Sequence, residues 1–114
     1  MCLNLSQLNI EKAVDVASIS SIALSGMHAA QTTLNASAHN IANMNTVGFR
    51  RQEVVQSAQA KGGVSTSLTA AGIDGPSLVT DVVAQLQAKN SFLANLAVFK
   101  TGDKMAGALL DKSA

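Results

Sequence analysis

The sequence is short of the residue types on which most functional sites and most hydrophobic cores depend. Its 114 residues include three Phe, no Trp, no Tyr, one Cys and one Pro, and only 13% are charged. A chain with a net charge of +1 and almost no aromatics lacks the basic patch and the stacking rings of a nucleic-acid-binding protein. A single cysteine, Cys2, supplies no disulfide framework and no set of metal ligands. We therefore expect no nucleic-acid partner, no metal and no cofactor.

Hydrophobic residues make up 47% of the chain, but many are small and none form a long run. No stretch approaches about 18 uninterrupted apolar residues, so we expect no direct membrane insertion. The first residues carry neither a basic group nor a sustained apolar run, so we expect no cleaved signal peptide. A chain that is apolar yet poor in bulky side chains suits close packing of helix against helix, including between subunits, better than a self-contained core.

Hydrophobic periodicity predicts two long helices, over about 19–43 and 77–111. Apolar residues in the first are spaced by three and four, as in a coiled-coil-like seam: Ile19, Ala23, Met27, Ala30, Leu34, Ala38 and Ile41. The second helix carries two apolar stripes. The first stripe is Val79, Val82, Val83, Leu86, Leu93 and Ala97, and the second is Phe92, Leu96, Phe99, Ala106 and Leu110. One partner helix cannot cover both stripes, so part of this surface should meet another subunit.

The middle of the chain changes period. Two stretches of β-branched residues flank Gly62-Gly63, which predicts a short β-hairpin over about 52–69. The predicted fold is mainly α, an antiparallel coiled-coil-like hairpin of two helices with a small β-hairpin between them. We expect one core domain over 19–114. For the N-terminal extension 1–18, a helix capped at Asn9 and a loose segment both remain open.

No residues have the spacing of an active site. His28 and His39 share one predicted helix but lie about 16 Å apart along its axis, too far to hold one metal ion or substrate atom. The carboxylates expected on the second helix, Asp81 among them, are several turns apart and form no acid–base pair. Arg50 and Arg51 follow a helix end and are interpreted as a solvated corner. We expect no enzymatic activity and no small-molecule substrate.

Two motifs nevertheless resemble signatures of the bacterial flagellar basal-body rod and hook family. The first combines Ser25–Ala30, Leu34 and the run from Asn40 to Arg51; the second combines Ala88–Asn95 and Val98–Met105. The similarity spans roughly residues 23–110. The chain departs from the family pattern at Asn90 and Phe92, where members usually carry Arg and Tyr. The segment between the two motifs is also short, which favours a minimal, proximal-rod-like member consisting of the terminal-helix core.

The resemblance implies a structural, non-enzymatic protein of the bacterial flagellum basal body. Family members are exported through the flagellar type III apparatus without a cleaved signal and polymerise through their terminal helices. The implied partners are other flagellar rod and basal-body subunits, with homo-oligomers expected. A different class remains open: a stand-alone helical-hairpin relative that acts as a soluble binding or regulatory partner.

The resemblance also implies roles for individual residues. Those expected to serve helix pairing and assembly are Met27, Ala30, Leu34, Ile41, Val83, Leu86, Leu93, Leu96 and Phe99. The second stripe of the later helix would be the intersubunit surface. The bend between the first helix and the β-hairpin would be formed by Asn43, Asn45, Thr46, Gly48 and Phe49, with Gly48 permitting the turn and Phe49 anchoring it.

Overall fold

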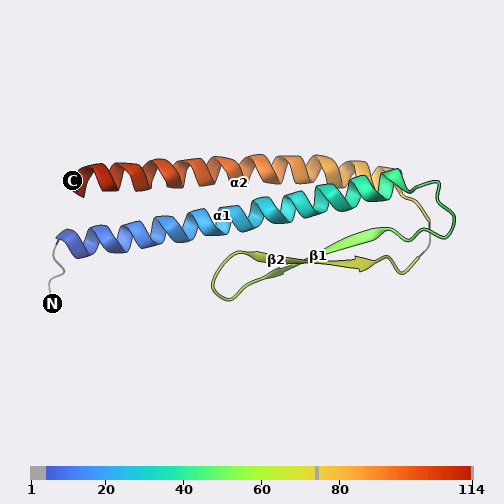
Figure 1. The fold of residues 1–114 in the computed structure, drawn as a ribbon, viewed down its shortest axis with the longest axis horizontal. Coiled ribbons are helices and arrows are strands. Elements are labelled where there is room, and N and C mark those ends of the chain that lie inside the picture. The colour runs from blue at the N-terminus through green and yellow to red at the C-terminus, as the bar shows by residue number, and fades with distance from the viewer. Residues whose placement is uncertain (1–4, 74, 114) are drawn as a thin grey trace.

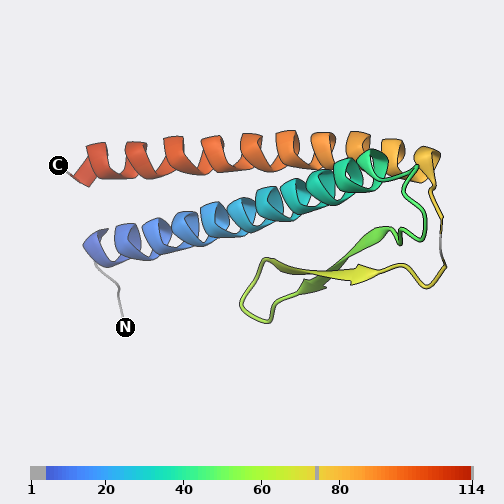
Figure 2. The ribbon, with the colours of Figure 1, turned by 45° about the vertical axis from the view of Figure 1, so that its right-hand side comes forward.

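The fold consists of two long helices with a β-hairpin between them (Figure 1). The computed structural model describes residues 5–73 and 75–113. In chain order the elements are α1 (Leu5–Ala42), β1 (Gln52–Ala58), β2 (Val64–Ala70) and α2 (Leu78–Ser113). α1 is the central element, because both α2 and the hairpin pack on it (Figures 1 and 2). The predicted fold class, mainly α with an antiparallel helix pair and a small β-hairpin, is confirmed.

α1 begins at Leu5, about four turns before the predicted start. Asn9 lies inside this helix, so the alternative in which it caps the helix is wrong. The segment before Gly26 contains neither Gly nor Pro, so nothing in it interrupts a helix. The far half of α2 also supplies a packing partner, since Val16 is buried and Ser20 lies against Gly102. Packing against α2 therefore stabilises the first turns of α1, where the hydrophobic periodicity of the sequence is weak.

The two helices pair along seams of small residues. Positions of α1 that turn toward α2 recur at intervals of three, four or seven, as do those of α2 that turn toward α1. The α1 seam comprises Val16, Ser20, Ala23, Met27, Ala30, Ser37 and Ile41, and the α2 seam Asp81, Ala88, Phe92, Asn95, Phe99, Gly102 and Ala106; all are buried or half-buried. The predicted period is therefore correct for the middle of α1.

Two glycines allow the seams to approach closely. A Cβ on Gly26 would stand 2.5 Å from Oδ1 of Asn95, and one on Gly102 would stand 2.7 Å from Oγ of Ser20. Both distances are too short for a real contact, so a Cβ at either glycine would have to displace the facing side chain of the partner helix. The helices lie closer at the turn end than at the end formed by the start of α1 and the end of α2 (Figures 1 and 2).

The hairpin pairs β1 and β2 antiparallel, from Gln52 opposite Ala70 to Ala58 opposite Val64. Its turn contains Gly62 and Gly63, whose φ angles of 94° and 90° strongly favour glycine. The N–H of Gln59 donates to the carbonyl of Gly63, and the N–H of Gly62 donates to that of Gln59, each at 3.0 Å. The Gly-Gly turn predicted from the sequence is thus where the chain reverses.

The molecule is a slender rod with a thin core. It measures 66 × 23 × 15 Å and its radius of gyration is 19.5 Å, whereas a compact domain of this length has about 13 Å. Its accessible surface is 7974 Å², against about 5,900 Å² for a typical folded monomer of this mass. Apart from Val16, the buried apolar residues of the described chain are all alanines. Much apolar surface is therefore left uncovered.

Candidate functional site

A network of three polar side chains ties together α1, the start of the β-hairpin and α2. We call Asn40, Arg51 and Asp81 the polar clasp. Asn40 and Asp81 are buried, at 2% and 3% exposed, and the Arg51 side chain is 15% exposed. Each comes from a different segment: Asn40 from the last turns of α1, Arg51 from the residue before β1, and Asp81 from the first turn of α2.

The side chains of the clasp bond to one another and to the backbone of Gln52. Arg51 donates two hydrogen bonds to Asp81, from Nη2 to Oδ1 and from Nε to Oδ2, the latter at 3.2 Å. Asn40 Nδ2 donates to Oδ1 of Asp81 at 3.1 Å and to the carbonyl of Gln52 at 3.0 Å. The N–H of Gln52 in turn donates to Oδ1 of Asn40 at 2.7 Å. The Asn40 amide therefore pairs with both backbone groups of Gln52, as a neighbouring strand would.

The charges of the clasp stabilise each other. Burial acts to raise the pKa of Asp81, but hydrogen bonds from Arg51 and Asn40 and the Arg51 charge outweigh it, so this pKa is lowered. The hydrogen bond to Asp81 raises the pKa of Arg51, with burial acting in the opposite direction. Asp81 is thus a carboxylate and Arg51 a cation at neutral pH. A bidentate arginine–carboxylate pair of this kind fixes the relative orientation of the segments it joins.

The predicted turn residues lie together between α1 and β1. Asn43 ends the helix by donating from Nδ2 to the carbonyl of His39 at 2.9 Å, and its own carbonyl accepts the N–H of Thr46 at 2.9 Å. Gly48 has a φ of 73°. The Phe49 ring packs edge-on against His39, with centroids 5.5 Å apart. Asn45 is exposed.

The predicted pairing residues divide into two groups. On α1, Ala30 is buried, Met27 and Ile41 are half-buried and Leu34 is 42% exposed. On α2, Leu96 and Phe99 are half-buried, whereas Val83, Leu86 and Leu93 are 45%, 58% and 52% exposed.

The two stripes of α2 differ in how far α1 covers them. At 100° per residue the first stripe lies diametrically opposite Ala88, Asn95 and Gly102, which face α1. The second stripe lies largely on the α1 side, where most of its residues are half-buried, although Leu110 is 68% exposed; its intersubunit role stays a prediction. We call the exposed residues of the first stripe the outer row: Val79, Val82, Val83, Leu86 and Leu93.

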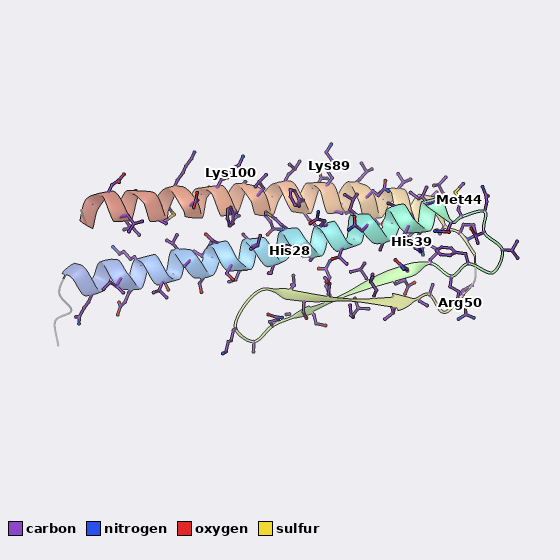
Figure 3. The ribbon with its side chains drawn as sticks, viewed as in Figure 1. His28, His39, Met44, Arg50, Lys89 and Lys100 are labelled. Carbon is purple, nitrogen blue, oxygen red and sulfur yellow. The ribbon has the colours of Figure 1, made fainter. Side chains whose placement is uncertain are left out.

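His28 and the lysines of α2 do not converge on a site. His28 is exposed, and Lys89 and Lys100 lie on the side of α2 away from α1 (Figure 3). Across the residues that the structure describes, no three His, Cys, Asp or Glu side chains are grouped to hold a metal ion. Cys2 lies outside the described residues.

Sequence reasoning missed the clasp. It treated Arg51 as a solvated corner, and the structure shows it paired with Asp81 instead. Arg51 and Asp81 are 30 positions apart, so no helical or strand spacing links them. The residue that could have indicated the clasp was Asn40. It carries a polar amide near the end of a helix, at a position where an apolar residue facing the neighbouring helix would be expected.

Comparison with known families gives a match over α1. Residues 21–50, the second half of α1 and the turn after it, match the family described as flagella basal body rod protein. Over this segment the chain is similar to the flagellar basal-body rod family. The matched range contains Gly26, Asn40 and the whole turn from Asn43 to Phe49. No curated protein matches the chain.

By length and composition alone, Ile10–Ala42 is apolar enough to cross a membrane, a test that core helices also pass. In the structure this helix packs against α2 and the hairpin.

Proposed function

We propose that the chain is a structural axial component of the bacterial flagellar basal body, a rod-type subunit that polymerises through its two long helices. The family match over residues 21–50 carries this proposal. In this role the protein is exported through the flagellar type III apparatus without a cleaved signal. It contacts other rod or basal-body subunits and further copies of itself, with no cofactor, substrate, nucleic acid or membrane insertion.

The shape of the subunit supports an assembly role. Its accessible surface exceeds that of a typical monomer of this mass by about 2,000 Å², and a standard protein interface buries about 800 Å² on each partner. The outer row places large apolar side chains on the face of α2 that no other element covers. A subunit with this much uncovered apolar surface is suited to a polymer wall, in which neighbouring subunits cover that surface.

A second apolar surface lies at the open end of the helix pair. Here a groove of about 660 Å³ runs between the start of α1 and the end of α2. Val16, Ile19, Met105 and Leu109 line it, together with Lys12 and Lys112. The outer row and this groove lie toward opposite ends of the rod, so they offer separate contacts to neighbouring subunits.

A deletion strain tests the proposal. Loss of the gene should abolish motility and stop rod assembly, and the wild-type gene supplied in trans should restore both. A strain that swims and assembles complete basal bodies without the protein would overturn the axial role. That outcome would favour the soluble binding or regulatory relative instead.

A further inference from the structure

The hairpin is attached to the rest of the molecule mainly by polar contacts at two places. It packs on α1, and its strands make no close backbone approach to α2. None of the strand residues is buried; those turned toward α1, such as Val54, Val64 and Thr66, are half-buried. An isolated two-stranded hairpin is at best marginally stable in water. Its position therefore depends on the contacts at its base and at its tip.

At the base the polar clasp holds the first residues of the hairpin. Asn40 pairs with the backbone of Gln52, and Asp81 accepts two hydrogen bonds from Arg51. The carbonyl of Arg51 also accepts the N–H of Ala71, just after β2, at 2.8 Å. Both ends of the hairpin thus join at Arg51, and Arg51 is held by Asp81 on α2.

At the tip the attachment is weaker. The N–H of Val64 donates to Oγ of Ser25 at 3.2 Å. Ser25 donates its own proton to the carbonyl of Ile22 at 2.7 Å. Beyond this the turn makes van der Waals contact through Gly62 and Gly63, which face Ile22 and Ser25. One neutral hydrogen bond contributes about 1 kcal/mol, whereas a bidentate charged pair is stronger.

The connections to the hairpin can accommodate movement. Gly48 before it and Gly75 after it have φ angles of 73° and 120°, and added Cβ atoms there would meet nothing within 4 Å. Beneath the hairpin is a trough of about 380 Å³. Its floor is formed by small residues of α1, including Gly26 and Ala29, and its walls by the hairpin and α2.

The geometry points to a lock: the polar clasp holds a hinged hairpin closed over α1, and loss of the Asp81 charge releases the hairpin while the helix pair stays intact. Without that charge Arg51 is left as a largely buried cation that has lost its ion-pair partner and keeps only the attraction of Glu53. Lifting the hairpin returns the guanidinium to water, whereas parting the helices would also expose their seams. The hairpin should therefore detach from α1 before the two helices separate. This inference does not depend on the proposed flagellar role.

Amide hydrogen exchange of Asp81→Asn tests the lock, because the substitution keeps the shape of the side chain and removes its charge. Amides of β1 and β2 should exchange roughly 10- to 100-fold faster than in the wild type. Amides near Ala23, Ala30 and Ala88 should keep their wild-type rates, and circular dichroism should show unchanged helix content. Asp103→Asn, an exposed carboxylate on the same helix, is the matched control and should leave both sets of amides unchanged.

Any other outcome of the exchange experiment overturns the proposed lock. Equal acceleration of hairpin and helix amides, or loss of the helical signal, would mean that the clasp stabilises the whole fold. Unchanged exchange in the hairpin would mean that the tip alone holds it. Arg51→Gln provides an independent variant, since it removes the cation from the hairpin side. It should accelerate exchange in the hairpin without affecting the helix seam.

Discussion

The side-chain amide of Asn95 lies directly over the backbone of Gly26, where α2 passes α1. A Cβ on Gly26 would stand 2.5 Å from Oδ1 and 2.7 Å from Cγ of Asn95. Asn95 is held in place by a 2.8 Å hydrogen bond from its Nδ2 to the carbonyl of Ser91. The absence of a side chain at position 26 is therefore part of how the helices pair.

Gly26→Ala should lower the free energy of unfolding by about 1–2 kcal/mol, because overpacking outweighs the gain in helix propensity. The measurement is urea unfolding followed by circular dichroism. Gly107→Ala is the matched control, since a Cβ there meets nothing within 4 Å. It should raise stability by up to about 1 kcal/mol. If both variants were stabilised alike, Asn95 would not restrict position 26.

Much of the helix pair could be predicted from sequence because its signal is local. Ala23, Met27 and Ala30 repeat at intervals of three and four, and they do face α2. Gly62-Gly63 likewise marks the hairpin turn through its own backbone preference. The sequence pattern was therefore sufficient to predict those elements whose structure depends on their own residues.

Other features depend on contacts between distant segments. The apolar character of Val83 and Phe99 is similar, so periodicity could not decide which stripe of α2 meets α1; the close approach at Gly102 decides it. The start of α1 depends on packing against the end of α2. The clasp joins Asn40, Arg51 and Asp81 across a turn and a hairpin whose geometry no spacing rule supplies.

A charge introduced on the outer row should impair assembly and leave folding intact. Leu86 is 58% exposed, so Leu86→Glu should change the free energy of unfolding by less than about 0.5 kcal/mol. The same variant should block incorporation into basal bodies, because a carboxylate would be buried at the proposed contact. Thermal unfolding and complementation of motility in the deletion strain measure the two effects.

Ala88→Glu, two positions away, is the matched control for a substitution in the seam. Ala88 is 5% exposed and faces α1, so a carboxylate there should cost several kcal/mol and disrupt the helix pair. If Leu86→Glu were as destabilising as Ala88→Glu, the outer row would not be a free surface. If it were stable and fully motile, the row would have no part in assembly.

The clasp predicts loss of stability in acid. The folded pKa of Asp81 lies below its ordinary value of 3.8, so the unfolded chain takes up a proton at this group first as the pH falls. Its contribution to stability is therefore fully present above the unfolded pKa and is lost as the pH drops through the folded pKa.

Urea unfolding at a series of pH values measures this contribution. The wild type should show no loss from Asp81 between neutrality and about pH 5, and an increasing loss below about pH 4. Asp81→Asn should be less stable at neutral pH, and the difference from the wild type should shrink in acid. A difference that stayed constant down to the lowest pH would show that the Asp81 charge is not what the clasp uses.

A side chain at Gly63 should destabilise the hairpin turn. Its φ is 90°, and a Cβ there would lie 2.7 Å from Oγ of Ser25. Gly63→Ala should therefore speed amide exchange in β2 and lower the unfolding free energy by about 1 kcal/mol or more. Gly72→Ala is the control, since that glycine has no positive φ and open space around it. Equal effects at both positions would contradict the close contact between the turn and Ser25.

The most direct test of the axial role is the amount of this protein in purified flagellar basal bodies, measured by quantitative mass spectrometry. The chain should co-purify in a fixed ratio to the other rod subunits, and Leu86→Glu should be made in the cell but be missing from the particles. Purified, complete basal bodies that lack the wild-type protein, in cells that contain it in abundance, would rule out the axial role.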